Sequence, residues 1–258
     1  MYMELIVPST FGADERDMKM RAVKYGFLAR AASIFGAEKI TIFEDEDDSI
    51  NTDRSSELLK KYLEYAETPP YLRKKLIPFD EDLKYANILP ALQTTSHGYS
   101  DNFREAYVKN VENGEATVEA GLEEDIKVYG DLEEGQRITV KMIGEREGKV
   151  IDSDELDTYW TYEVSNTGKK LGSVLEKRDA TVLGTSAHGD DYRETEFETS
   201  GEISIVFGSA WRGIPSLVDR GDVDRDQFDH LLNLVPEQNT RTVRTEEALM
   251  ICLARVFR

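Results

Sequence analysis

Three nearly continuous apolar runs in the last third of the sequence end in small or turn-forming residues. The runs cover residues 180–185, 203–208 and 231–235. Such runs are typical of strands covered on both faces of a parallel sheet, and α/β proteins usually bind ligands at the carboxyl ends of these strands. Gly208 and Gly213 would permit positive φ angles and close approach of a ligand there. A plain strand-ending turn is the alternative that the glycines alone leave open.

Most familiar catalytic motifs are missing from the sequence. It has no Walker loop, no GxSxG, no HExxH and no GxGxxG after the first apolar run. His97, His188 and His230 lie far apart, so we predict no histidine metal cluster. Cys252 is the single cysteine, which excludes an intrachain disulfide and argues against a zinc site built on cysteines. We therefore expect the chemistry in the C-terminal loops.

The acidic charge of the chain bears on its partners. A net charge of -19 argues by itself against nucleic acid, because phosphate binding depends on basic groups. The acids are spread along the whole chain, which suits the cytoplasm of a halophile. At ~1 M salt the Debye length is only ~3 Å, so remote acids hardly repel RNA. One basic cluster, Arg73-Lys74-Lys75, is either the polar face of a helix opened by Pro69-Pro70 or a set of phosphate contacts.

Composition and hydropathy predict a globular cytoplasmic protein with no membrane partner. The 258 residues are 40% hydrophobic and 32% charged, which is typical of a folded chain. No apolar run approaches the ~20 residues needed to cross a bilayer. The first residues lack the basic segment and the long apolar stretch of a signal peptide, and instead suggest a buried strand.

The elements that would position a site begin with alternating strands and helices in residues 1–90. Strands are predicted at 5–7 and 39–43, and helices at about 14–35 and 52–65. Gly36 is expected to end the first helix. The acidic loop 44–48 could hold a cation, but a solvated loop is the favoured interpretation. The first helix is expected to bury one apolar face, made of Ala22, Val23, Phe27, Ala31 and Ile34.

Short alternating runs then predict a small antiparallel barrel, plausible as an OB-fold. The expected strands are 106–108, 116–118, 126–129, 138–140 and 149–151, separated by turn signals such as Asn113-Gly114. The barrel is an insertion, because the α/β pattern resumes after it. Phe103, Tyr107 and Tyr129 could stack bases, although aromatic residues in small barrels usually belong to the core.

Three motifs together resemble the SPOUT class of RNA methyltransferases. Residues 205–215 (IVFGSAWRGIP) are similar to its glycine-containing loop. Residues 232–240 (LNLVPEQNT) and 243–248 (VRTEEA) are similar to its cofactor loop and final helix, and residues 27–36 (FLARAASIFG) to its arginine-bearing N-terminal motif. The insertion and its flanks resemble an archaeal-eukaryotic branch with an OB-like domain inside the SPOUT domain. The resemblance covers nearly the whole chain.

The resemblance implies a knotted α/β fold that binds S-adenosylmethionine. It implies a Rossmann-like parallel sheet with a C-terminal trefoil knot, formed by residues 1–92 and 158–258, and an RNA-binding barrel at 93–157. Two subunits would pair as a homodimer around the knot. Backbone polar groups beside apolar side chains suit the adenine ring. The implied cofactor contacts are Thr185, Phe207, Gly208, Gly213, Leu234, Pro236, Asn239, Val243 and Thr245, with Leu234 alternatively a core residue.

The arginines gain expected roles from the same resemblance. Arg30 by itself would be a surface cation or part of an ion pair. In the motif it is expected to hold a target phosphate or to position the acceptor nucleotide, with Arg244 and Arg212 acting similarly on the RNA side. The resemblance favours a uridine-type base in large-subunit ribosomal RNA as the target. The basic character of Arg73, Lys74 and Lys75 in an otherwise acidic chain makes them candidates for further RNA contacts.

Two other functions remain open at this point. A non-catalytic RNA-binding or ribosome-assembly factor could keep the fold without methyl transfer. A nucleotide-binding enzyme of another doubly wound type is disfavoured, because no phosphate-binding glycine motif follows the first strand.

Overall fold

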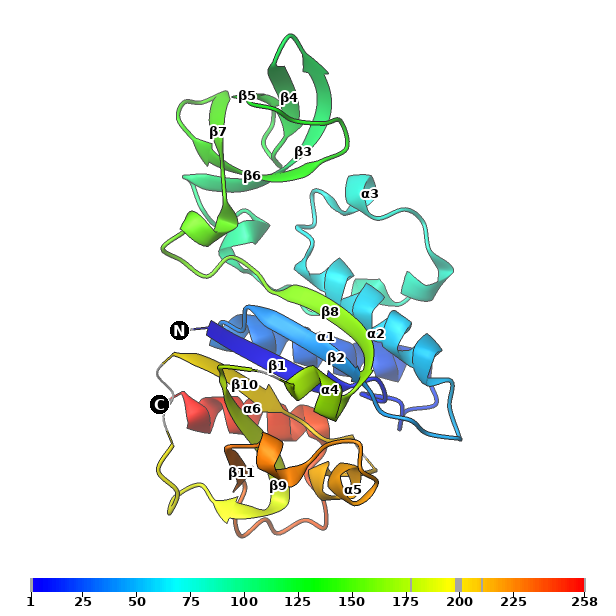
Figure 1. Ribbon diagram of the computed structural model, residues 1–258. Helices are drawn as coiled ribbons and strands as arrows, with labels where there is room; N and C mark the ends of the chain where they lie inside the picture. Colours follow the sequence, from blue (N-terminus) through cyan, green and yellow to red (C-terminus); the bar gives the residue numbers. More distant parts are fainter. Residues whose placement is uncertain (1, 177, 198–200, 210, 258) are drawn as a thin grey trace. The chain divides into compact units, whose positions relative to one another are not determined.

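The computed structural model describes residues 2–176, 178–197, 201–209 and 211–257 (Figure 1). Its main sheet has six strands in the order β11-β9-β10-β1-β2-β8, and every neighbouring pair is parallel. The strands are β1 (Tyr2–Pro8), β2 (Lys39–Glu44), β8 (Glu163–Lys170), β9 (Thr181–Asp191), β10 (Glu202–Val206) and β11 (His230–Asn233). The predicted parallel α/β sheet is thus confirmed.

Strand β8 is the one strand of this sheet that the sequence pattern did not predict. It lies at the sheet edge, pairs with β2 only, and has half-buried to exposed residues along its length. Its polar sequence, EVSNTGKK, carries none of the apolar alternation that marks a half-buried strand. Edge strands need less burial, so their sequence signal is weak.

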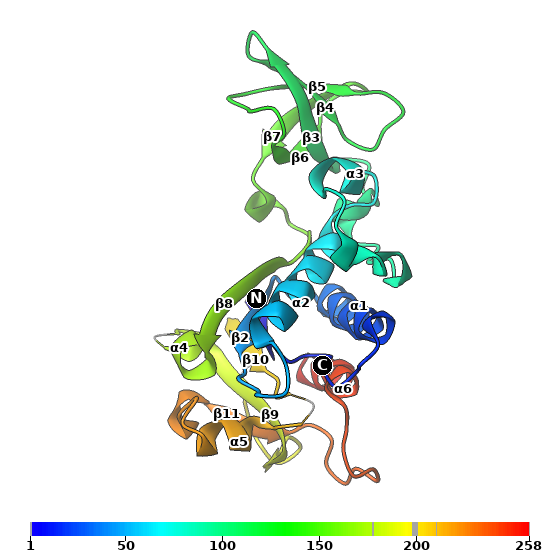
Figure 2. The same ribbon diagram turned by 90° about the vertical axis from the view of Figure 1, so that its right-hand side faces the viewer.

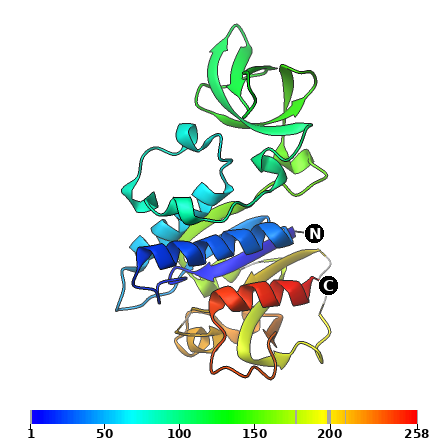
Figure 3. The ribbon, with the colours of Figure 1, turned by 180° about the vertical axis from the view of Figure 1, so that it is seen from behind.

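Helices cover both faces of the sheet. The α-helices of the described residues are α1 (Met18–Phe35), α2 (Thr52–Glu67), α3 (Arg73–Leu76), α4 (Leu171–Leu175), α5 (Ile214–Asp219) and α6 (Thr245–Val256), of which α3 lies outside the compact unit that contains the sheet. Seen from behind, α1 and α6 lie side by side on one face (Figure 3). The short helices α4 and α5 lie on the opposite face (Figure 2), where Leu171, Val174 and Leu217 join a core with the strand residues.

Helix α1 begins and ends at residues whose chemistry fixes its length. The Asp17 carboxylate accepts a hydrogen bond of 2.6 Å from the Lys19 N–H, which satisfies a free donor of the first turn. At the other end Gly36 has a left-handed φ of 73° and donates its N–H to the Ala32 carbonyl. The predicted end at Gly36 is confirmed, and the helix starts four residues later than expected.

The predicted apolar face of α1 is confirmed at Ala22 and Ala31, which are buried, and wrong at Phe27 and Ile34, which are 51% and 49% exposed. The buried face also contains the large side chains of Tyr25 and Leu28, so it is turned around the helix from the predicted face. Because α1 is apolar nearly all round, the spacing of apolar residues does not show which side is buried.

The inserted strands close into a five-stranded barrel in the order β3-β4-β5-β7-β6. They are β3 (Phe103–Glu112), β4 (Glu115–Glu119), β5 (Ile126–Tyr129), β6 (Arg137–Met142) and β7 (Glu147–Ile151), as the sequence predicted. The barrel is not purely antiparallel, because β5 and β7 pair in parallel. This order is consistent with an OB-like barrel, and its interior holds Val108, Val118 and Val140.

The chain divides into two compact units. One comprises residues 1–64, 85–90 and 162–258, and the other residues 65–84 and 91–161. Within the second unit, Arg137 forms ion pairs with Glu67 at 2.7 Å and with Glu105 at 2.6 Å. The Trp160 indole N–H also donates to Glu105, whose side chain is buried. These bonds connect residues 65–84 with the barrel, although the sequence pattern had grouped them with the first domain.

Helix length and hydropathy give a simple result for membranes. No helix in the part of the chain that the structure describes is long and apolar enough to span one.

Candidate functional site

The loops that follow β9, β10 and β11 meet at one edge of the sheet. Their strands are parallel neighbours in the order β11-β9-β10, so their carboxyl ends point the same way. The chain order reverses between β10 and β1, since the chain runs outward from β1 through β2 to β8 and returns on the other side. Ligands of open α/β sheets bind in the crevice at such a reversal. The edge predicted from the apolar runs is therefore a suitable ligand site.

Side-chain hydrogen bonds join β9 to the ends of β10 and β11, and the start of α6 to the loop after β10. Thr185 Oγ1 donates to the Val206 carbonyl at 3.0 Å, and Thr245 Oγ1 donates to the Gly208 carbonyl at 3.4 Å. Asn233 Nδ2 donates to the Ala187 carbonyl at 3.1 Å. The structure thus brings Thr185, Gly208 and Thr245 together from three segments.

The two glycines of the loop after β10 differ in what they require. Neither has a positive φ, so that expectation was wrong; Gly213 has an ordinary φ of -77°. A Cβ on Gly208 would lie 2.9 Å from the Arg212 carbonyl oxygen, because the loop folds back on itself. Among the described residues, a Cβ on Gly213 would meet only Pro215 Cδ, at 3.5 Å. Gly208 is therefore needed for the loop itself, whereas no atom of the described residues accounts for Gly213. Ala210 lies outside the described residues.

The other expected cofactor residues fall into two groups. Phe207 and Leu234 are 1% and 3% exposed, so they can offer a ligand only backbone atoms. Arg255 Nη1 already donates to the Leu234 carbonyl. Pro236 and Val243 are half-buried and Asn239 is exposed, so their side chains are accessible. The loop between β11 and α6 turns at Glu237, which has a φ of 60°.

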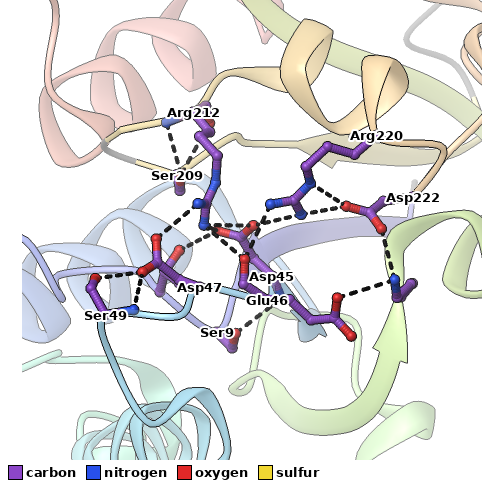
Figure 4. Close-up of polar contacts among 11 residues, drawn as sticks. Ser9, Asp45, Glu46, Asp47, Ser49, Ser209, Arg212, Arg220 and Asp222 are labelled. Carbon is purple, nitrogen blue, oxygen red and sulfur yellow. Dashed lines mark hydrogen bonds and ion pairs between the residues drawn. The ribbon is translucent and has the colours of Figure 1, made fainter.

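The acidic loop after β2 is solvated only in part. Glu46 and Asp48 are exposed, as the sequence interpretation expects, whereas Asp45 is enclosed by side chains of the same chain (Figure 4). The Asp45 side chain is fully buried (0% exposed), and Arg212 and Arg220 lie 3.2 and 3.3 Å from it. Arg212 Nη1 also contacts Asp47 at 2.8 Å. Hydrogen bonds from Ser49, together with the Arg212 guanidinium, lower the pKa of Asp47. Among the described residues, the cations that this loop holds are three side chains of the same chain: Arg212, Arg220 and Lys170, whose Nζ lies 3.3 Å from the Glu46 carboxylate.

A further charged group near this edge had no sequence signal. Lys24 of α1 is buried and lies 2.5 Å from Asp14 and 3.2 Å from Glu246 at the start of α6. Burial disfavours its charge, yet the Asp14 hydrogen bond and the Glu246 charge raise the pKa of Lys24 overall. Lys24 thus links α1 to the first turn of α6. Sequence reasoning missed it because the residues are distant along the chain.

The two arginines expected at the reaction centre lie apart. Arg244 is exposed and directly precedes α6, where its N–H donates to the Glu247 carboxylate at 3.0 Å. It is adjacent to Thr245 and hence to the loop after β10. Arg30 lies 12 residues into α1, about 18 Å along the helix from its start at the carboxyl edge of β1. Within one chain Arg30 is therefore not brought to the loops after β10 and β11.

The basic cluster divides in the same way. Arg73 Nε donates to the Thr68 carbonyl at 3.0 Å, and its guanidinium lies 4.5 Å from the centre of the Tyr65 ring. It thereby occupies carbonyls at the end of α2. Lys74 and Lys75 are exposed, and Lys75 lies 3.6 Å from Glu119.

Metal ligands form no cluster among the described residues: no group of three or more His, Cys, Asp or Glu could hold an ion there.

Residues 2–256 match a protein family described as "Putative RNA methyltransferase". The chain belongs to this RNA methyltransferase family. It is 30% identical to an uncharacterized protein of Halobacterium salinarum over 98% of both chains. It is also 32% identical to the 28S rRNA (uridine-N(3))-methyltransferase of Drosophila melanogaster, over 98% of this chain and 61% of that protein. The resemblance found in the sequence motifs is thus confirmed at the level of the family.

A solved structure similar to this chain is the SpoU methyltransferase AviRb of Streptomyces viridochromogenes in complex with AdoMet. The similarity has a TM-score of 0.43 and 9% sequence identity. It covers 99% of this chain and 56% of that one, so the chain spans little more than half of AviRb.

Proposed function

We propose that this protein transfers a methyl group from S-adenosylmethionine to N3 of a uridine in large-subunit ribosomal RNA. The observation that carries the proposal is the hydrogen-bonded meeting of β9, the end of β10 with its following loop, and the start of α6 at the carboxyl edge of the sheet, in a member of an RNA methyltransferase family. The name of the Drosophila relative supplies the target nucleotide and the modified atom.

The residues at this edge fit the proposed cofactor. Gly213 has an open side where a ligand could approach the backbone, and Pro236 and Val243 add half-buried apolar surface for an adenine ring. Phe207, Gly208 and Leu234 would contribute backbone groups, because burial removes the two side chains from contact. Thr185, Asn239 and Thr245 would complete the polar contacts.

The chemistry requires little from side chains. S-adenosylmethionine, when bound, supplies a methyl group on a positively charged sulfur that leaves as a neutral thioether. The protein must hold N3 of the uridine in line with that methyl carbon, while the N3 proton passes to a base. Arg244 is placed to hold a phosphate beside the acceptor. An Arg244→Ala variant is expected to keep cofactor affinity and to lose methylation rate at subsaturating RNA.

Arg30 can contribute only if another surface brings it to the site. Met20, Phe27 and Ile34 of α1 are 46%, 51% and 49% exposed and are spaced by seven residues, so they form one apolar stripe. Arg30 lies three residues after Phe27 and four before Ile34, on the same side of the helix. This stripe supports the proposal of a homodimer, in which Arg30 would lie at the interface.

Analytical ultracentrifugation at high salt tests the dimer. Ile34→Asp is expected to give monomers, whereas Ile143→Asp should leave the mass unchanged. Ile143 is a suitable control because it is 64% exposed and lies in the barrel unit. A monomeric wild-type protein would contradict the proposal, and so would an Ile34→Asp protein that stays dimeric.

RNA contacts are proposed in the barrel unit as well. Lys74 and Lys75 are exposed enough to reach phosphates, whereas Arg73 is occupied by carbonyls. Tyr129 is 59% exposed and so is the best placed of the three aromatic candidates for stacking on a base.

We also propose that the protein is cytoplasmic and adapted to high salt, which rests on the single cysteine and the spread of acidic charge.

The first test is a calorimetric titration of S-adenosylmethionine into the protein in multimolar KCl. High salt is needed because a chain with a net charge of -19 repels itself in dilute buffer. Saturable binding, followed by detection of 3-methyluridine in ribosomal RNA treated with the enzyme, is the expected result. No binding by the folded protein would instead favour the non-catalytic RNA-binding factor.

A further inference from the structure

Asp45, directly after β2, carries a fully buried carboxylate (0% exposed). The loop after β1 holds it from one side: Thr10 Oγ1 donates to Asp45 Oδ2 at 2.7 Å, and the Asp45 N–H donates to Ser9 Oγ at 3.1 Å. A buried carboxylate is costly unless it is hydrogen-bonded and paired with a cation. The cations that pair with it therefore show what this residue does.

Both cations come from the segment after β10. Arg212 Nη2 lies 3.2 Å from each oxygen of Asp45, and Arg220 Nη2 lies 3.3 Å from Oδ1 (Figure 4). The Arg212 side chain is 23% exposed and that of Arg220 is 31% exposed. One buried carboxylate thus joins the loops that follow three adjacent strands, namely β2, β1 and β10.

Within the loop 208–213, the described residues Ser209 and Arg212 are joined by two hydrogen bonds. The Arg212 N–H donates to Ser209 Oγ at 3.0 Å, and Ser209 Oγ donates back to the Arg212 carbonyl at 3.1 Å. The same carbonyl oxygen lies where a Cβ on Gly208 would collide. Fixing the Arg212 guanidinium therefore fixes the turn between Gly208 and Gly213. The hydrogen bond from Thr245 to the Gly208 carbonyl holds this loop from its other side.

A purely structural ion pair is the simpler interpretation, and such pairs are weak evidence for stability. Two features favour a positioning role. The carboxylate meets the loop at the edge of the sheet where a ligand is expected, and it contacts the loop through long side chains instead of filling the apolar core.

We propose that Asp45 is a positioning residue for the cofactor loop 208–213. Its carboxylate holds Arg212 and Arg220 and thereby fixes the backbone that binds S-adenosylmethionine. The proposal rests on the proposed function, since that function assigns this loop to the cofactor. Because Asp45 is fully buried, it acts through the loop and does not touch the ligand.

The test compares Asp45→Asn with Asp48→Asn. Both changes remove one negative charge from the same acidic loop, but Asp48 is exposed. Three quantities are measured: hydrogen exchange at the Arg212 amide without ligand, the Kd for S-adenosylmethionine, and KM against kcat in methylation. For Asp45→Asn we expect exchange at least tenfold faster, and Kd and KM for the cofactor at least tenfold higher. The kcat at saturating cofactor and the Kd for RNA should stay within twofold.

The outcomes separate this proposal from the proposed function. Wild-type exchange and wild-type cofactor affinity in a folded Asp45→Asn protein would overturn the positioning role, as would equal effects of Asp48→Asn. If the wild-type protein does not bind the cofactor, the proposed function fails, and the positioning role fails with it.

Loss of folding in Asp45→Asn is covered by a milder change. Arg220→Gln removes one partner at a partly exposed position, and Arg220→Lys keeps the charge. We expect Arg220→Gln to raise the cofactor Kd several-fold and Arg220→Lys to restore part of the affinity. Unchanged Kd and exchange in Arg220→Gln would count against the proposal.

Discussion

Replacing Gly208 and Gly213 by alanine separates what the loop needs from what the ligand needs. A Cβ on Gly208 would lie 2.9 Å from both the Arg212 carbonyl oxygen and Gly213 Cα. These are backbone atoms, which cannot swing aside like the end of a side chain, so the loop must shift. Gly213 has an ordinary φ of -77°, and of the atoms in the described part of the chain its Cβ would meet only Pro215 Cδ, at 3.5 Å.

The expected magnitudes follow from this geometry. Overpacking of this kind costs about 1 to 3 kcal/mol, which corresponds to a loss of cofactor affinity of about 5- to 150-fold if the strain is relieved by moving the binding loop. Gly208→Ala should also lower the melting temperature by about 2 to 4 °C for each kcal/mol. Gly213→Ala should leave the melting temperature unchanged or slightly raised, because alanine restricts the unfolded chain.

Calorimetric titration with S-adenosylmethionine, together with thermal unfolding of each variant, gives the result. If the cofactor binds at this loop, Gly213→Ala should also lose affinity for S-adenosylmethionine while its thermal stability stays intact. The reason is that the added methyl group would collide with the ligand and not with the protein. Wild-type affinity in both variants would refute the placement of the cofactor at this loop. An unchanged melting temperature in Gly208→Ala would refute the steric argument itself.

Three further predictions concern titration and reactivity. Burial opposes the charge of Asp222, but hydrogen bonds from Lys170 and Arg220 hold its pKa below the ordinary value. The folded state therefore binds fewer protons at this group than the unfolded chain does, and it loses stability as the pH falls through about 4. Asp222→Asn should flatten the fall in melting temperature between about pH 5 and pH 3. Burial lowers the pKa of His97, whose Nε2 lies 2.9 Å from the Glu67 carbonyl, so the stability of the folded state should also fall below about pH 6.5. His97→Gln should remove this loss of stability, as measured by urea unfolding at a pH above and a pH below about 6.5. Burial raises the pKa of Cys252 to about 12, so a thiol reagent at mild pH should not react with the native protein and should react fully in guanidinium.

Local patterns in the sequence were sufficient for most elements. The left-handed φ that ends α1 requires a residue such as Gly36, and the barrel strands alternate between turns such as Asn113-Gly114. The apolar runs of β1, β9 and β10 mark strands buried on both faces. These features depend on residues close together in the chain, so they can be read without tertiary structure. The trefoil knot, which came from resemblance alone, stays a prediction.

Tertiary structure decided which surfaces face inward. The exposed Phe27 and the buried Leu28 are neighbours in one helix, and only the packing of α1 against other elements shows which of its apolar sides is buried. Strand β8 is polar and is held by backbone pairing with β2 at an edge, so its composition gives no strand signal. In both cases the neighbour, and not the residue itself, determines the outcome.

Charge pairing shows most clearly what the sequence determines and what only the tertiary structure decides. The sequence determined that residues 44–48 are a cluster of acids, and that glycines and an arginine follow β10. It could not show that Asp45 meets Arg212 and Arg220, which are 167 and 175 residues away. That pairing exists because the sheet places β2, β1 and β10 side by side with their carboxyl ends together. Over such separations the strand order, which no local pattern encodes, decides which charges meet.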